Sequence, residues 1–263
     1  MEMRPLGSTG LSVGVLGLGT VKWGRTLGLK YPQPITLPTD DELRTLLAVA
    51  REHGMNVIDT APAYGIAEER IGRLIERRED WVITTKFGER FIEGVSHFDF
   101  SRSALSDSLD SSLRSLRTDR VDAVLVHSDG VIEHRFPDEL VDALKREKEA
   151  GRVRAIGISS KTKEGGLAAL EWADVLMVTL NPEYLDELSS IREAARRGVG
   201  ILVKKALLSG HGGGPAKPSV RECLATSLRE SGVSSVVIGS VSPINVENNA
   251  RIADEVLGTH GAP

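Results

Sequence analysis

The sequence has a single cysteine, no cluster of histidines and no long apolar run, and each absence excludes a class of protein. Cys223 alone permits neither an intramolecular disulfide nor a thiolate metal cluster, so nothing favours an oxidising compartment. The six histidines lack a ligand-like spacing such as His-x-x-x-His, and we expect no required metal. No apolar run approaches the ~18 residues that span a bilayer, and residues 1–4 lack the apolar core of a signal peptide. The expected location is the cytoplasm.

An excess of charge of one sign is also missing. The chain has 33 basic and 37 acidic residues, a formal net charge of −4, and no long single-sign run. A balanced surface of this kind gives no electrostatic footprint for nucleic acid or for a membrane, so we expect neither partner. The 263 residues, 40% of them hydrophobic, are enough to bury a sizeable core.

Short apolar segments alternate with amphipathic segments along the chain. Val- and Ile-rich runs such as Val121–Val126 are typical of parallel strands that are covered on both faces. Leucines spaced by three or four residues, as from Leu105 to Leu116, indicate helices with one apolar stripe. The expected strands are 15–19, 56–59, 81–86, 121–127, 153–159, 175–180, 200–204 and 235–239. The expected helices are 39–52, 67–78, 101–117, 137–150, 163–172, 187–197, 219–231 and 244–256.

Eight strand–helix units without a composition break predict the architecture. They fit a (β/α)8 TIM barrel better than an open, doubly wound sheet of five or six strands. We therefore expect one α/β domain over residues 1–263. The apolar pieces on either side of residues 7–10 predict a small N-terminal β-hairpin that plugs one end of the barrel.

Ionisable residues stand at the ends of three consecutive expected strands, at Asp59, Lys86 and His127. In a (β/α)8 barrel these ends meet on the face that carries active sites, and neighbouring strands lie about 4.8 Å apart. Tyr64 follows in a turn between strand and helix, where functional residues gather. We predict that the four side chains lie together, although each alone also has a structural interpretation as a cap, a packed ring or a solvated strand end.

The chemistry that requires this set is delivery of a proton to a carbonyl oxygen while hydride reaches the carbonyl carbon. A free tyrosine titrates near 10, and a nearby ammonium such as that of Lys86 favours the phenolate and lowers its pKa. Asp59 would keep Lys86 protonated and oriented. His127 would hydrogen-bond the carbonyl oxygen and steady the charge that develops there.

Residues 54–72 resemble the signature of the aldo-keto reductase family, in which an Asp-Thr-Ala-x-x-Tyr-Gly block supplies two members of a catalytic tetrad. Asp59 and Tyr64 fall on those two positions, and Lys86 and His127 complete the tetrad in order and in strand number. The likeness continues in residues 16–20, 152–159 and 239–243. The resemblance implies a short bacterial-type NAD(P)-dependent oxidoreductase that reduces a small aldehyde or ketone to an alcohol with Tyr64 as proton donor, as a monomer or small homo-oligomer.

The resemblance also implies a nicotinamide cofactor held by the barrel, since the sequence has no G-x-G-x-x-G fingerprint of a Rossmann domain. Met177 stands where the family usually has glutamine, and Lys204 stands where it often has an aromatic residue. The implied cofactor-binding residues are Gly19, Thr20, Ser159, Met177, Lys204, Leu207, Gly239, Ser242 and Asn249.

Cofactor choice depends on two positions near the last helix. Val241 and Asn245 stand where family members that grip the 2′-phosphate often carry Arg or Lys, while Ser242, Lys204 and Lys205 offer partial compensation. On family resemblance we expect NADP(H) to be slightly preferred over NAD(H).

Two other functions stay open at this point. One is a nucleotide-binding redox sensor or regulatory subunit with slow or no turnover, which the departures at Met177 and Lys204 would suit. The other is a phosphate-handling barrel isomerase that uses His127 or Glu69 as base, although the sequence lacks a Gly-rich phosphate loop at the seventh and eighth strands. The physiological substrate is not readable from the sequence.

Overall fold

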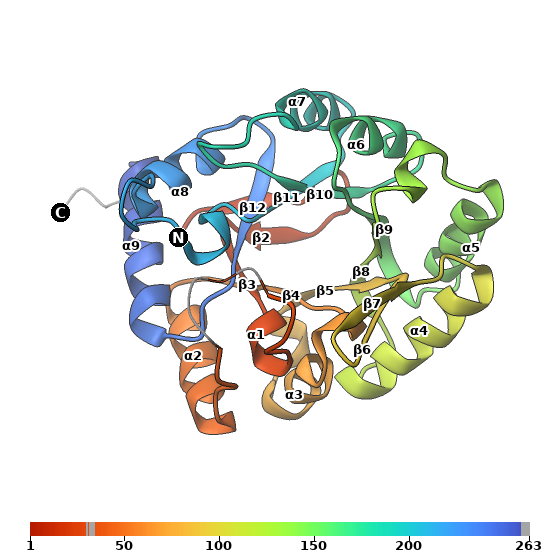
Figure 1. Ribbon diagram of the computed structural model, residues 1–263, viewed down its shortest axis with the longest axis horizontal. Helices are drawn as coiled ribbons and strands as arrows, with labels where there is room; N and C mark the ends of the chain where they lie inside the picture. Colours follow the sequence, from red (N-terminus) through yellow and green to blue (C-terminus); the bar gives the residue numbers. More distant parts are fainter. Residues whose placement is uncertain (30, 32–34, 259–263) are drawn as a thin grey trace.

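The computed structural model describes residues 1–29, 31 and 35–258, and in this part of the chain eight parallel strands close into a barrel ringed by helices (Figure 1). The closed hydrogen-bonded circuit confirms the predicted (β/α)8 barrel. In order around the barrel the strands are β3 (Leu16–Gly19), β4 (Val57–Asp59), β5 (Val82–Phe87), β8 (Val121–His127), β9 (Val153–Ser159), β10 (Val175–Thr179), β11 (Gly200–Lys204) and β12 (Val233–Ile238), which pairs back onto β3.

The outer helices form where the apolar stripes predict them. Thr39 and Glu42 cap the first of them reciprocally, each side chain bonding the other's backbone N–H. These helices are α2 (Asp40–Glu52), α3 (Ala67–Leu74), α4 (Arg102–Leu116), α5 (Asp138–Glu149), α6 (Lys163–Ala169), α7 (Leu188–Arg196), α8 (Val220–Leu228) and α9 (Pro243–Leu257).

Several expected boundaries are wrong by about three residues. Helices α6 and α8 end three residues earlier than predicted, and β12 begins two residues earlier. Helix α3 ends at Leu74 rather than at residue 78. There Arg78 donates to the carbonyl of Trp81 at 2.7 Å and to Asp122 at 2.8 Å, which ties this stretch to the strands instead of extending the helix.

The predicted N-terminal hairpin is confirmed and closes one end of the barrel. Strands β1 (Met3–Pro5) and β2 (Ser12–Gly14) pair antiparallel. Leu6, Leu11 and Val13 from this hairpin are buried in the same apolar cluster as residues that point into the barrel from its strands. The barrel interior is therefore a packed core rather than a channel.

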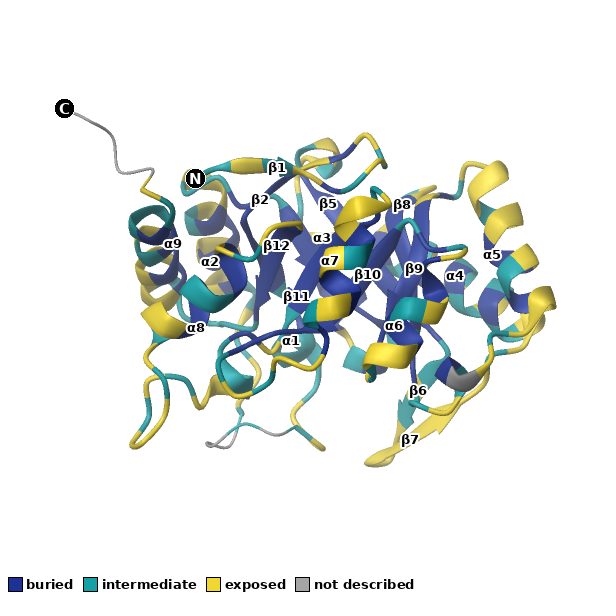
Figure 2. Cartoon of the chain, turned by 90° about the horizontal axis from the view of Figure 1, so that it is seen from above, coloured by how far each residue is buried: buried dark blue, intermediate teal, exposed yellow. Residues whose placement is uncertain are grey.

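A second hairpin, which the sequence interpretation did not include, follows β5. Strands β6 (Glu89–Ile92) and β7 (Val95–Phe98) pair around Glu93 and Gly94, whose φ angles are 49° and 89°. Positive φ at both central residues is typical of a two-residue hairpin turn. Figure 2 shows this hairpin on the side of the molecule opposite β1, so it stands beyond the C-terminal ends of the barrel strands.

Short helices occupy several loops of the barrel. Those that follow barrel strands are α1 (Val21–Gly24), η1 (Pro62–Tyr64), η3 (Ile132–His134) and η4 (Leu208–Gly210), whereas η2 (Arg78–Asp80) precedes β5 and lies at the opposite end. Among the residues that the structure describes, none of the helices has the length and apolar content required to cross a bilayer.

Candidate active site

A buried ion pair joins the ends of two neighbouring strands. Nζ of Lys86 on β5 donates to Oδ1 of Asp59 on β4 at 2.6 Å and to the carbonyl of Thr60 at 2.8 Å. Oδ1 of Asp59 also accepts a bond from the hydroxyl of Thr84 at 3.0 Å. Burial alone would lower the pKa of Lys86, but its attractions to Asp59 and Tyr64 outweigh burial and raise it. Lys86 is therefore held as an ammonium.

Tyr64 is delivered to this pair by the short helix η1. The loop is fixed by close backbone approach, because Gly65 has φ 63° and a Cβ there would lie 2.1 Å from the carbonyl of Gly24. Nζ of Lys86 lies 4.9 Å from the centroid of the Tyr64 ring. The pKa of Tyr64 differs from the sequence expectation: burial raises it, and the opposing effect of Lys86 is too small to bring it below its ordinary value. The phenol thus stays protonated at neutral pH.

His127, at the end of β8, completes the group. Its ring lies edge-on to that of Tyr64, with centroids 6.1 Å apart and an interplanar angle of 85°. Burial lowers the pKa of His127, the ammoniums of Lys86 and Lys204 add to that effect, and Glu89 opposes it. The structure therefore brings all four predicted side chains together around the end of three adjacent strands.

A fifth ionisable residue, Glu89, adjoins the group and was missed by the sequence interpretation. Its Oε2 lies 2.8 Å from Nδ1 of His127, and its Oε1 accepts a bond from Ser96 at 2.6 Å and lies 3.7 Å from Arg25. Burial opposes ionisation, yet these partners together lower the pKa of Glu89 to about 2. The Glu93–Gly94 turn was the available signal, since it marks a hairpin that starts three residues after Lys86.

The predicted cofactor-binding residues lie at the same end of the barrel. Gly19 is in register with Asp59, and the hydroxyl of Thr20 donates to the carbonyl of Asp59 at 3.0 Å. Ser159 ends β9, in register with His127. Leu207 and Gly239 follow β11 and β12, Ser242 is the N-cap of α9, and Asn249 is a buried residue of that helix.

Lys204 and Ser159 form a polar contact suited to an amide ligand. Nζ of Lys204 donates to Oγ of Ser159 at 2.8 Å and also bonds the carbonyl of Ser160. A serine hydroxyl accepts through oxygen and keeps its own proton, so Ser159 remains able to donate to a carboxamide oxygen. Burial is the main cause that lowers the pKa of Lys204 to about 7, helped by Lys205.

The remaining predicted residues differ in what they offer. Met177 is buried in the apolar interior of the barrel, and its carbonyl accepts a bond from the N–H of Ser160 at 3.0 Å, so its cofactor contact stays a prediction. At the start of α9 the Ser242 hydroxyl accepts the N–H of Asn245 at 3.4 Å, and the N–H of Ser242 bonds the Ser240 hydroxyl at 3.1 Å, so the cofactor contact of Ser242 stays a prediction. The predicted set contains hydroxyls, an amide, glycines and one ammonium but no carboxylate, and so it fits a nicotinamide nucleotide.

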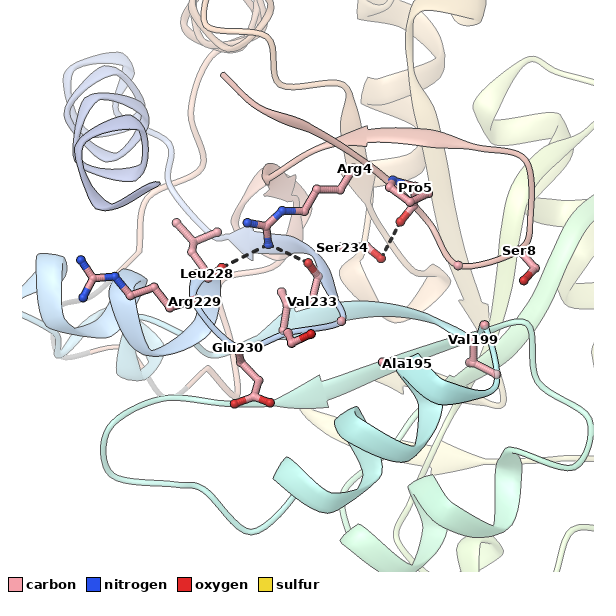
Figure 3. A pocket seen from close by; sticks show the side chains of 14 residues that line it. Arg4, Pro5, Ser8, Ala195, Val199, Leu228, Arg229, Glu230, Val233 and Ser234 are labelled. Atoms are coloured by element: carbon pink, nitrogen blue, oxygen red, sulfur yellow. Dashed lines mark hydrogen bonds between the residues drawn. The ribbon is translucent and has the colours of Figure 1, made fainter. Parts of the chain in front are cut away.

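A separate cavity of about 460 Å³ lies beside the N-terminal hairpin (Figure 3). Its most prominent charged group, Arg4, donates to the carbonyls of Leu228 at 3.1 Å and Val233 at 2.8 Å, and Ser234 donates to the carbonyl of Pro5 at 2.9 Å. These bonds join the hairpin to α8 and β12 and occupy Arg4 and Ser234 with backbone carbonyls. This cavity is part of the plug, away from the ionisable cluster.

Comparisons with known proteins agree with this geometry. A family model described as the Aldo/keto reductase family matches residues 15–214. L-galactose dehydrogenase of Arabidopsis thaliana is 28% identical over an alignment of 299 positions, gaps included, which covers 97% of this chain and 89% of that protein. A Pseudomonas aeruginosa protein provisionally described as an aldo-keto reductase superposes with a TM-score of 0.87 at 43% identity, over 97% and 95% of the two chains. An aldo-keto reductase of Bacillus halodurans in its holo form superposes with a TM-score of 0.80 over 100% and 92%, and at 23% identity it supports the fold alone.

Proposed function

The chain belongs to the aldo/keto reductase family and is an NAD(P)-dependent oxidoreductase, and we propose that it reduces an aldehyde or ketone to an alcohol with Tyr64 as the proton donor. The observation that carries this proposal is the convergence of Asp59, Tyr64, Lys86 and His127 at the C-terminal end of the barrel. The family gives the reaction class, and we propose that these four side chains carry out its proton-transfer and charge-stabilising steps.

Each of the four side chains has a task in the proposed reaction. A bound nicotinamide nucleotide supplies the hydride that reaches the carbonyl carbon. Tyr64, a neutral phenol, gives its proton to the carbonyl oxygen, and the ammonium of Lys86 stabilises the phenolate that remains. Asp59 keeps Lys86 charged and oriented. His127 hydrogen-bonds the oxygen on which negative charge develops.

The cofactor is proposed to lie across the ends of strands β9, β11, β12 and β3. Ser159, oriented by Lys204, would donate to the carboxamide. Ser242 and the N-terminus of α9 would hold phosphate, with Asn249 deeper on the same helix. Gly19, Thr20, Met177, Leu207 and Gly239 complete the proposed contact set. On family grounds alone we propose a slight preference for NADP(H) over NAD(H).

We infer the substrate class from the proposed reaction and not from the shape of the site. A carbonyl that accepts hydride becomes an alcohol, so the reverse reaction oxidises an alcohol. The Arabidopsis relative is named a dehydrogenase of L-galactose. A substrate panel for this chain should therefore contain simple aldehydes and ketones for reduction and aldoses for oxidation.

Absorbance of the reduced nicotinamide tests the proposal directly. Steady consumption of NADPH or NADH with at least one carbonyl compound is the expected result. Cofactor binding, followed by tryptophan fluorescence, without turnover on any member of the panel would favour the alternative of a redox sensor or regulatory subunit. A protein that bound neither cofactor would contradict both functions.

A further inference from the structure

Glu89 and His127 form a pair that the proposed reaction does not yet use. The carboxylate comes from the first strand of the β6–β7 hairpin, and the imidazole comes from the end of barrel strand β8. Nδ1 of His127 is closed off from solvent, and among the described residues it has no well-aligned hydrogen bond. The charged oxygen beside it is Oε2 of Glu89, at 2.8 Å.

The carboxylate is itself held in place from its far side. Ser96, on the other strand of the hairpin, donates to Oε1 of Glu89 at 2.6 Å, and the guanidinium of Arg25 lies 3.7 Å from the same oxygen. Arg25 is fixed in turn by its bond to the carbonyl of Leu27 at 2.9 Å and by the ring of Phe91 beneath it. Oε2 is thus left to face the imidazole.

His127 faces charges from several elements, and they do not act alike. Lys86 on β5 and Lys204 on β11 disfavour a positive imidazole, and burial disfavours it as well. Glu89 on β6 acts in the opposite sense. The phenol of Tyr64 on η1 lies edge-on to the ring and is neutral.

A carboxylate beside one ring nitrogen decides which nitrogen carries the proton of the neutral ring. An ionised carboxylate only accepts hydrogen bonds, so a lone pair on Nδ1 would face negative oxygen, whereas an N–H there is stabilised. With the single proton on Nδ1, Nε2 carries a lone pair and cannot donate. Donation from Nε2 then requires the doubly protonated ring.

Resting on the proposed function, we propose that Glu89 is a positioning residue: it holds a proton of His127 on Nδ1, so that Nε2 donates to the substrate oxygen only in the imidazolium form. Protonation of His127 thereby becomes a condition for efficient reduction. The rate should fall as pH rises through the pKa of His127, which burial places below its ordinary value. Loss of one donor to an oxyanion costs on the order of 10²-fold in rate.

Nitrogen-15 NMR of the histidine rings tests the pairing without any turnover. The His127 signal is assigned by its absence in a His127→Gln protein. In the wild-type protein we expect the neutral ring to carry its proton on Nδ1. In Glu89→Gln we expect a mixture of tautomers, because an amide both donates and accepts. We also expect a lower His127 pKa, because the carboxylate that favours the imidazolium is gone.

Single-turnover rates of carbonyl reduction between pH 5.5 and 8.5 test the consequence. We expect a fall of about 10²-fold in the wild-type protein and less than about tenfold in Glu89→Gln, whose neutral ring can still donate from Nε2. Glu89→Asp should restore the steep fall, since it retains the carboxylate. Glu93→Gln removes the same charge from an exposed site on the same hairpin and should behave like the wild-type protein.

Two results would overturn the proposal: a wild-type neutral ring with its proton on Nε2, or identical pH profiles for wild type and Glu89→Gln. Thermal melting of Glu89→Gln and Glu93→Gln shows whether either change merely unfolds the hairpin, and the Nδ1 tautomer in wild type needs no variant. Absence of turnover with every carbonyl would sink the proposed reaction, while the NMR data would still decide the Glu89–His127 pairing.

Discussion

Lys86 and Asp59 form an ion pair of 2.6 Å in which the lysine side chain is 1% exposed and the aspartate side chain 6%. Both charges have given up nearly all of their hydration and depend on each other and on bonds from Thr84 and to the carbonyl of Thr60. A pair of this kind contributes little net stability while intact, but removal of one partner leaves an uncompensated buried charge. The pair therefore places an ammonium beside the ring of Tyr64, and loss of either partner destabilises the folded protein.

Asp59→Asn should lower the free energy of unfolding. The ammonium of Lys86 loses its counter-charge, and we expect a loss of about 3–5 kcal/mol, or a Lys86 that sheds its proton to avoid it. Urea unfolding at pH 7 measures the change. Asp107→Asn, at an exposed site of α4, is the matched control and should change stability by less than about 0.5 kcal/mol. Equal stability of the two variants would contradict the buried ion pair.

Tyr64→Phe should remove the proton donor and leave the cofactor in place. We expect kcat to fall by on the order of 10²- to 10⁴-fold, the usual value of general acid catalysis, while the Kd for the cofactor stays within about threefold. The measurement is single-turnover reduction of the best aldehyde, because product release can mask the chemical step. An unchanged rate at neutral pH would exclude Tyr64 from the mechanism.

Lys204→Met should flatten part of the pH dependence of stability. The pKa of Lys204 is about 7 in the folded protein and 10.5 as an ordinary lysine, so between these values the unfolded chain binds more protons. Unfolding free energy then rises with pH across this window, by up to about 1.4 kcal/mol per unit for one group. Urea unfolding at pH 7.5 and pH 9 should show the rise in wild type and a smaller one in Lys204→Met. Equal slopes would mean that Lys204 titrates normally.

The sequence predicted the barrel and the three strand-end residues because the same pattern encodes both. An apolar strand of a (β/α)8 barrel ends where its polar residue begins, so Asp59, Lys86 and His127 follow from strand boundaries that the structure reproduces within one residue. The roles of these residues and the predicted cofactor contacts stay proposals. Periodicity does not report such roles.

The parts that the sequence did not predict have local causes. The β6–β7 hairpin is short and largely exposed, so it lacks the apolar pattern by which the barrel strands are recognised. Glu89 was consequently assigned no role from the sequence. The raised pKa of Tyr64 was also missed, because the sequence shows that a lysine is near but not how completely the phenol is buried. Burial of a side chain depends on the packing of loops from distant parts of the chain.

The final prediction concerns the choice between NADPH and NADH. Val241, which packs partly against the core, and exposed Asn245 stand at the start of α9, where a basic residue would pair with a 2′-phosphate. The stem of an arginine at position 241 can keep the apolar contact while its guanidinium reaches outward. Val241→Arg should therefore tighten NADPH by about tenfold to a hundredfold and change NADH little, because only NADPH presents a dianion there.

Titration of NADPH and NADH against the wild type, Val241→Arg and Ala150→Arg tests this prediction. Ala150→Arg adds the same charge at an exposed site at the end of α5, on the opposite side of the barrel from α9 (Figure 1), and should leave the ratio of the two Kd values unchanged. A wild-type preference for NADPH above about a thousandfold, unmoved by Val241→Arg, would show that Ser242, Lys204 or Lys205 already holds the phosphate. If the ratio of the Kd for NADH to the Kd for NADPH rises in Val241→Arg alone, the 2′-phosphate lies at the N-terminus of α9. This result would also show that the missing basic residue, rather than the shape of the site, weakens discrimination in this chain.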